Sequence, residues 1–147
     1  MLKSKIKTTE YVWLILLLLS VVAAIIKIFV GFDIDEGYAV SMPYRLLQGD
    51  HMFLDMWEVH QTSSFLPAVA LRVYDKITGD TAYAVIYLRI LATVIHAVFA
   101  YLIYRLLQSD IEKEWAVLLS LLYFNLLPKW LVSLDFSLQQ VWGITLV

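Results

Sequence analysis

The chain has 147 residues, of which 61% are hydrophobic and 16% are charged, with a net charge of −2 and no cysteine. Soluble domains contain roughly 45–50% apolar residues, so this composition indicates a membrane protein. The small negative charge argues against nucleic acid or an anionic surface as a partner. The lack of cysteine excludes disulfides and thiolate metal sites. We expect an all-α, polytopic helical membrane protein.

The first transmembrane helix is predicted over residues 11–32, after an N-terminal segment of residues 1–10. This run is apolar apart from Ser20 and Lys27, and about 22 residues are enough to cross a hydrocarbon core of about 30 Å. It is longer than the apolar core of a signal peptide, and no small-x-small cleavage site accompanies it, so we interpret it as a retained helix. Three lysines precede the run, which predicts a cytoplasmic N-terminus.

Residues 33–81 are predicted to form an outer loop that contains two amphipathic helices. Residues 31–80 hold eight of the thirteen acids of the chain against three bases. Apolar residues recur at helical spacing within 36–48 and 63–78, and a Gly-Asp pair follows each segment as a stop signal. Both segments are too short to span a bilayer, so we expect them to lie in the plane of the membrane interface.

The second transmembrane helix is predicted over residues 82–105 and carries Arg89 and His96 on one face. Arg89 lies about 10 Å from the outer end. An arginine at that depth is unfavourable by roughly 2.5–3.5 kcal/mol unless it faces protein or water. It could form a structural ion pair with an acid of the outer loop, or bind a phosphate through its forked donors. For His96 we favour a neutral side chain that is bonded to a neighbouring helix.

The rest of the chain is predicted to contain a cytoplasmic connection and two further spans. The connection covers residues 106–114, the third span covers 115–128, and the fourth begins within 131–147 after a break at Pro128. The last apolar stretch stops at Val147 without a polar flank. We therefore expect the chain to be the N-terminal part of a longer protein and not to be active alone.

The order of these features carries a resemblance. Asp35-Glu36 follows the first span, the first amphipathic helix ends in Arg-Leu-Leu-Gln-Gly-Asp at 45–50, and residues 53–61 form an aromatic and acidic turn before Arg89-Ile90. This order resembles the start of the GT-C type integral-membrane glycosyltransferases, the superfamily of protein O-mannosyltransferases and aminoarabinose transferases. The polar Asp135-Phe136 is similar to the start of the fourth helix in that family.

The resemblance implies transfer of a sugar from a polyprenyl-phosphate donor to an acceptor glycan, lipid or protein at the outer membrane face. Asp35 would take the proton of the acceptor, with Glu36 as its catalytic neighbour. Arg89 would hold the donor phosphate, and Asp33 and Asp35 could share a divalent cation. The acceptor side would be lined by Asp55, Glu58 and His60.

Two other classes of function fit the same residues. The chain could be a non-catalytic membrane scaffold subunit whose outer helices dock a partner. It could also be a transporter in which Arg89 and His96 belong to a substrate or proton path. A scaffold should tolerate Asp35→Asn, whereas a catalyst should lose activity.

Overall fold

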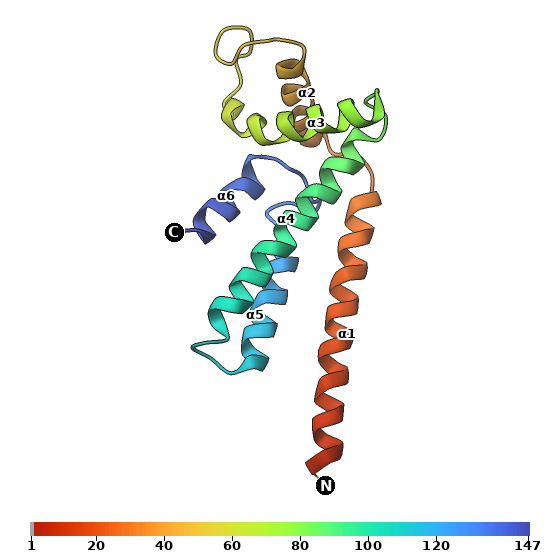
Figure 1. Ribbon diagram of the computed structural model, residues 1–147, viewed down its shortest axis with the longest axis vertical. Helices are drawn as coiled ribbons and strands as arrows, with labels where there is room; N and C mark the ends of the chain where they lie inside the picture. Colours follow the sequence, from red (N-terminus) through yellow and green to blue (C-terminus); the bar gives the residue numbers. More distant parts are fainter. Residues whose placement is uncertain (1) are drawn as a thin grey trace.

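The computed structural model describes the backbone of residues 2–147 and the side chains of residues 10–147. Within these residues the chain is all-helical, with 72% of residues in helix, no strand, six α-helices and one short 3-10 helix. Figure 1 shows that the long helices run along the molecule and that the shorter helices gather at one end. The predicted all-α class is confirmed.

Two helices are long and apolar enough to cross a membrane. α1 covers Leu2–Phe29, of which Glu10–Phe29 meets this criterion, and α4 covers Ala84–Leu107. The predicted bounds 11–32 and 82–105 differ by at most three residues from Glu10–Phe29 and Ala84–Leu107. α1 ends before residue 32 because the following segment already caps the next helix.

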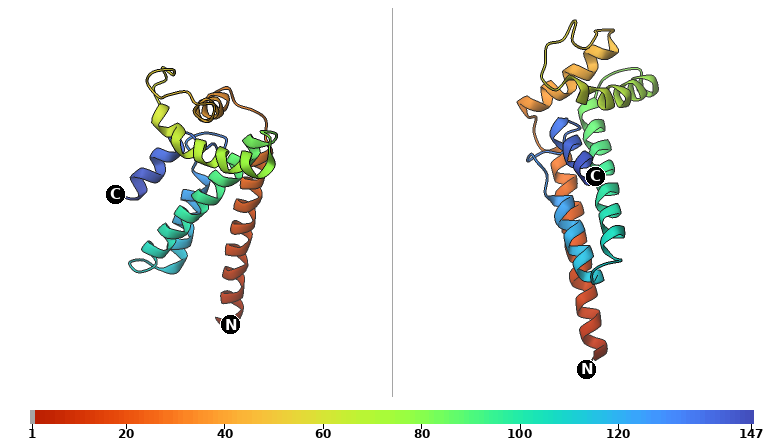
Figure 2. Two further views of the ribbon diagram at one scale, coloured as in Figure 1. Left: turned by 45° about the horizontal axis from the view of Figure 1, so that its top comes forward. Right: turned by 90° about the vertical axis from the view of Figure 1, so that its left-hand side faces the viewer.

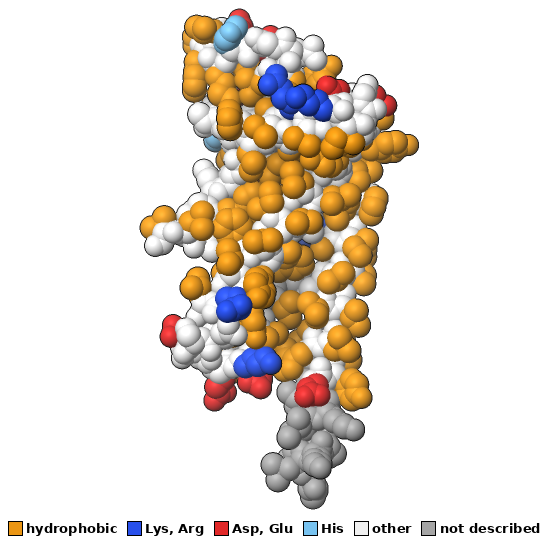
Figure 3. Space-filling view, viewed as in Figure 1, with side chains coloured by type: hydrophobic (Ala, Val, Ile, Leu, Met, Phe, Trp, Pro, Cys, Tyr) orange, Lys and Arg blue, Asp and Glu red, His pale blue; other side chains and the backbone are white. Residues whose placement is uncertain are grey.

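The outer surface of the long helices is apolar. Twelve large hydrophobic side chains of α1 from Tyr11 onward are between 43% and 66% exposed. In the space-filling view, hydrophobic side chains form a band along α1 and α4, with charged side chains gathered above and below it (Figure 3). An apolar surface of this extent marks an interaction site rather than a surface that faces water.

Helices α2 and α3 form the cap at one end of the long helices. α2 covers Ile34–Leu47, a 3-10 helix η1 covers Gln61–Ser64, and α3 covers Phe65–Thr78. These bounds confirm the two short helices predicted at 36–48 and 63–78. α3 ends at Gly79, whose φ of +74° lies in the left-handed region that glycine tolerates. The views of Figures 1 and 2 show α3 lying across the end of α4.

The last two helices are shorter than predicted. α5 covers Lys113–Asn125 and α6 covers Phe136–Thr145. The 13 residues of α5 extend about 20 Å, which is less than the thickness of a hydrocarbon core. The fourth helix begins five residues later than residue 131, because Leu126 to Asp135 is non-helical and Asp135 caps α6 by accepting from the N–H of Leu138. The helix predicted at 115–128 is therefore present with bounds shifted by two to three residues, and the helix predicted from residue 131 begins later than expected.

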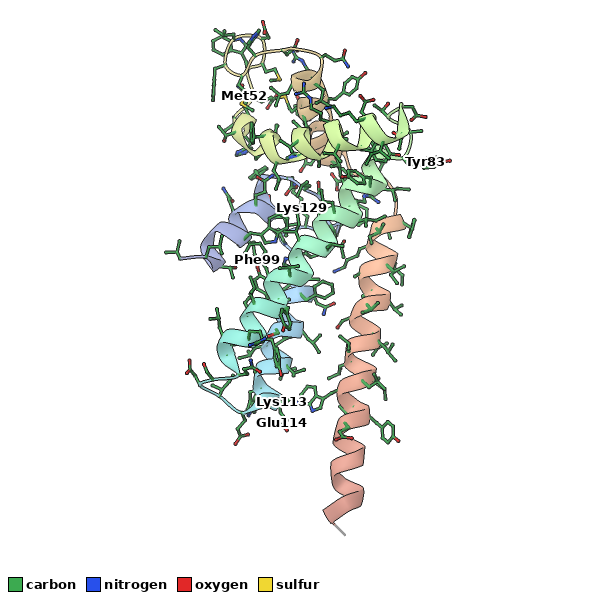
Figure 4. The ribbon with its side chains drawn as sticks, in the orientation of Figure 1. Met52, Tyr83, Phe99, Lys113, Glu114 and Lys129 are labelled. Atoms are coloured by element: carbon green, nitrogen blue, oxygen red, sulfur yellow. The ribbon has the colours of Figure 1, made fainter. Side chains whose placement is uncertain are left out.

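The core lies where α3, α4 and the segment before α6 meet. It contains small residues of α4, and the buried part of the non-helical segment 126–135 packs against them together with α6. The fully or nearly fully buried members are Ala70, Leu71, Ala84, Leu88, Ala92, Val132, Leu134, Leu138 and Trp142. This packing places Lys129, and Asp135 which pairs with it, beside the cap helices, at the end of the molecule opposite the start of α5, where Lys113 and Glu114 lie (Figure 4).

Candidate functional site

The segment that joins α1 to α2 is fixed by Asp33. One carboxylate oxygen of Asp33 accepts from the backbone N–H of Asp35 at 2.9 Å and caps α2, and the other accepts from the indole N–H of Trp130 at 2.8 Å. These two hydrogen bonds, followed by the charge of Lys129, hold the pKa of Asp33 below its usual value despite an opposing effect of desolvation. Both oxygens of Asp33 are therefore already engaged.

Arg89 lies close to the acidic cluster, as the sequence predicted, and its partner is Glu36. Nε and Nη2 of Arg89 donate to the two carboxylate oxygens of Glu36 at 2.6 and 2.5 Å. Nη1 donates to the carbonyls of Ile28 and Val30 at 2.7 and 2.6 Å, and Nη2 donates to the carbonyl of Gly31 at 2.8 Å. All five donors of the guanidinium have acceptors, and the residue is 3% exposed.

This geometry gives Arg89 a structural task. The carbonyls at the end of a helix have no partner within the helix, and a cation is favourable there. Arg89 of α4 donates to one carbonyl in the last turn of α1 and to two carbonyls just after it, and it binds the first turn of α2 through Glu36. A donor phosphate would have to displace these contacts, so the arrangement favours the ion-pair interpretation of Arg89 over the phosphate-ligand interpretation. Glu36, which the resemblance implied as a catalytic neighbour of Asp35, is 3% exposed and has both carboxylate oxygens bound to Arg89.

Asp35 faces a cavity. Its side chain is 69% exposed. Consecutive residues of a helix point about 100° apart, so Asp35 faces out of the cap although the adjacent Glu36 faces into it. The cavity beside it has a volume of about 250 Å³. Its walls come from α2, η1, α3 and the segment that precedes α6. They are formed by Asp35, Tyr38, Ala39, Met42, Glu58, His60, Ser63, Ser64, Pro67, Lys129, Leu134, Asp135 and Phe136.

Lys129 is the cation of this cavity. Its ammonium lies 2.9 Å from the carboxylate of Asp135 and 3.3 Å from that of Asp35. Desolvation lowers the pKa of Lys129, but the hydrogen bonds and charges of Asp135 and Asp35 outweigh it and the net shift is upward. Lys129 is therefore charged at neutral pH. Asp135 is 6% exposed and holds Lys129 more firmly than the exposed Asp35 does.

Two of the three predicted acceptor-side residues line the same cavity. Glu58 and His60 both do so, and the imidazole of His60 stacks on Phe136 with ring centroids 3.6 Å apart. This stacking ties the outer loop to the start of α6. Lys129 was not among the site residues predicted from the sequence, and Asp135 was named only through the resemblance. The break at Pro128 beside an isolated lysine was the one local signal.

Asp55 lies elsewhere in the outer loop. Its carboxylate accepts from the backbone N–H of His51 at 2.8 Å and lies 3.1 Å from the His51 ring, and its carbonyl accepts from Arg45 at 2.8 Å. The N–H and ring of His51 hold the pKa of Asp55 below its usual value, with a smaller contribution from the charge of Arg45. Asp55 does not line the cavity, so its contacts give it a role in folding the loop rather than in facing the acceptor.

His96 is bound on both ring nitrogens deep in the helix bundle. The indole N–H of Trp142 donates to Nδ1 at 3.1 Å, so the proton lies on Nε2, which faces the carbonyl of Tyr123 at 3.2 Å. His96 is 1% exposed. These contacts link α4, α5 and α6, in agreement with the predicted neutral histidine bonded to neighbouring helices.

Residues 10–147 contain no group of three or more His, Asp or Glu side chains that could hold a metal ion. Of the predicted pair, Asp33 has both carboxylate oxygens in hydrogen bonds, and the carboxylate of Asp35 lies 3.3 Å from the ammonium of Lys129.

Comparisons of the chain with protein-family models, with curated proteins and with solved structures find no match. The function is therefore argued from the cavity and its residues.

Proposed function

We propose that the chain forms the acceptor side of a membrane glycosyltransferase, at which a sugar moves from a polyprenyl-phosphate donor to an acceptor hydroxyl or amine. The carrying observation is an exposed carboxylate, Asp35, that faces a cavity of about 250 Å³ together with Lys129, Glu58 and His60. The cavity lies at the cap end of two helices that are long and apolar enough to cross a membrane. A lipid tail and an aqueous acceptor can meet at such a place.

The proposed reaction is one displacement. The oxygen or nitrogen of the acceptor attacks the anomeric carbon, and a new glycosidic bond forms with inversion. The bond between the anomeric carbon and the phosphate oxygen breaks, and its electron pair leaves with the polyprenyl phosphate. The acceptor proton passes to the Asp35 carboxylate, which must lie within hydrogen-bond reach of the acceptor.

Lys129 is the residue that we assign to the departing phosphate. Its ammonium is the cation of the cavity, and a fixed positive charge stabilises negative charge that develops on a leaving group. Asp135 holds Lys129 in place, whereas the ion pair between Lys129 and the exposed Asp35 is the longer of the two, at 3.3 Å. Exposed ion pairs are weak, so a bound phosphate can replace Asp35 as a partner of Lys129 and leave Asp35 free to accept a proton.

The contacts of Arg89 and His96 bear on the transporter alternative. A residue of a transport path must be able to change partners, yet all five donors of Arg89 and both ring nitrogens of His96 are already bound within the protein. This arrangement supports structural roles for both residues and weakens the case for a path through them.

The test separates a catalyst from a scaffold. Membranes in which the protein is expressed are incubated with a panel of polyprenyl-phosphate sugars, and the release of polyprenyl phosphate is measured because it is common to every sugar. Asp35→Asn should lower the rate by roughly 10²–10⁴. Asp50→Asn is the matched control, because Asp50 is also a solvent-accessible carboxylate paired with a cation, Arg45, at 2.6 Å, but it does not line the cavity.

Release that depends on Asp35 and not on Asp50 supports the proposal. Equal losses in the two variants would mean that the loop acts through folding, and the assignment of Asp35 would be wrong. No release in any variant would agree with the expectation that this chain is not active alone, so binding of a polyprenyl phosphate to the wild type and to Lys129→Gln is measured on the same membranes. No binding by the wild type would favour the scaffold.

A further inference from the structure

The helix α3 has a second apolar face besides the one that packs in the core. The buried face contains Pro67, Ala68, Ala70 and Leu71. The residues Phe65, Val69, Val73 and Ile77 follow one another at steps of four, so they form one stripe along the opposite side. Their exposed fractions are between 47% and 78%.

Charged residues of α3 are ordered around this stripe. Arg72 and Lys76 each precede a stripe residue by one position and therefore run along one flank. Asp75 lies on the side of this basic flank that faces away from the apolar stripe. Both basic side chains are exposed, and neither forms an ion pair with any residue in 10–147. Asp50, which lines the groove next to Arg72, is already paired with Arg45.

The stripe continues the apolar surface of the long helices. Figure 3 shows Lys and Arg side chains over α3 directly above a hydrophobic band that extends down over α4 and α1. α3 lies across the end of α4, which is the orientation of a helix that rests in a membrane surface. Apolar side chains then face the acyl chains, and the basic flank lies at the level of the phosphates.

We propose that the exposed face of α3 binds anionic phospholipid head groups through Arg72 and Lys76. The net charge of the whole chain gives no reason to expect an anionic partner, but the charges of α3 are segregated, and it is the local order of apolar, basic and acidic residues that matches a lipid surface. The inference rests on membrane insertion of α1 and α4 and does not require the transferase chemistry.

The experiment measures which lipids surround α3. The chain has no cysteine, so Val73→Cys can carry a single fluorophore. The protein is placed in two kinds of phosphatidylcholine bilayer. One contains a small fraction of spin-labelled phosphatidylglycerol and the other contains the same fraction of spin-labelled phosphatidylcholine, and both labels lie near the top of the acyl chain. A second label at Val94→Cys, on the exposed surface of α4, is quenched by lipids spin-labelled deep in the chain and reports insertion.

Phosphatidylglycerol should quench the label at Val73 at least about twofold more than phosphatidylcholine does, since each basic residue near a surface attracts anionic lipid. Arg72→Gln with Lys76→Gln should bring this ratio close to one, and so should high salt. Arg105→Gln with Lys113→Gln is the matched control, because it removes two basic residues far from α3, one in the last turn of α4 and one at the start of α5, and it should leave the ratio unchanged.

Equal quenching by the two lipids at Val73 would overturn the proposal. So would a lack of quenching at Val73 while the label at Val94 is quenched, because α3 would then not face lipid. A lack of quenching at Val94 would show that α4 is not inserted, and the transferase proposal would fail together with this one.

Discussion

Removing either member of the Arg89–Glu36 pair should destabilise the protein, and removing both should cost less than the sum of the two single losses. The pair joins three helices, because the guanidinium from α4 binds a carboxylate of α2 and three carbonyls in the last turn of α1 and just after it. Arg89→Met leaves the Glu36 carboxylate charged and buried. Glu36→Gln leaves the guanidinium without its counter-charge.

The magnitude follows from the burial of both side chains, which are 4% and 3% exposed. Breaking a buried ion pair by removing one partner costs about 3–5 kcal/mol, which lowers a melting temperature by roughly 6–20 °C in a chain of this size. The double variant Glu36→Gln with Arg89→Met leaves no uncompensated charge, although the three carbonyls still lose their donor. Its loss should therefore be smaller than the sum of the two single losses, by about 0.5–3 kcal/mol.

The assay is thermal unfolding of the wild type, the two single variants and the double variant in one detergent, followed by size-exclusion recovery. Arg89→Lys is added because it keeps the charge but not the fork, and binding of a polyprenyl phosphate is measured on the folded fraction. Unchanged melting of the single variants would refute the structural role of the pair. A normal melting temperature of Arg89→Lys together with weakened donor binding would support the interpretation of Arg89 as a ligand of the donor phosphate.

Three further predictions concern the cap and the cavity. A cysteine at Asp50 should react with an impermeant reagent added outside intact cells, and labelling only after permeabilisation would show the opposite topology. Lys129→Gln should weaken binding of a polyprenyl phosphate by about tenfold or more, the loss expected for a hydrogen bond to a charged group. Lys129→Arg should restore the binding. Full binding by Lys129→Gln would contradict the assignment of Lys129 to the phosphate. The hydrogen bonds from Asp35 and Trp130 lower the pKa of Asp33 from 3.8, so their stabilising contribution is complete above pH 3.8 and is lost as the pH falls through the lower folded value. Tryptophan fluorescence should show this acid transition, and a transition that persists unchanged in Asp33→Asn would contradict its assignment.

The long helices and the cap helices could be predicted because local signals agree there. α1 and α4 are marked by length and hydropathy, and α2 and α3 by helical spacing and glycine stops, so their bounds differ from the predicted ones by only a few residues. The prediction for residues 126–135 was wrong because the local signals there are ambiguous. Hydrophobicity does not distinguish a buried irregular segment from the start of a membrane helix, and Leu131 to Leu134 are buried without being helical.

The candidate site could be predicted only in part. Asp35, Glu58 and His60 lie along one loop, so sequence order placed them together. Lys129 approaches Asp35 across 94 positions of the chain, and no local pattern reveals such a contact. The main acceptors of Arg89 besides Glu36 are backbone carbonyls, which carry no side-chain signature in a sequence.

The adjacent residues Asp35 and Glu36 also explain why activity alone cannot assign Arg89. Glu36 holds the first turn of α2 to Arg89, and Asp35 is displayed to the cavity from that same turn. A change at Arg89 therefore moves the proposed base even if Arg89 never contacts a substrate, and a displacement of about 1 Å at a catalytic group can cost roughly 10² in rate. A phosphate ligand and a positioning residue would both lower the rate of transfer. Only the phosphate ligand would lower donor affinity without lowering the melting temperature, so binding and stability have to be measured on the same variant.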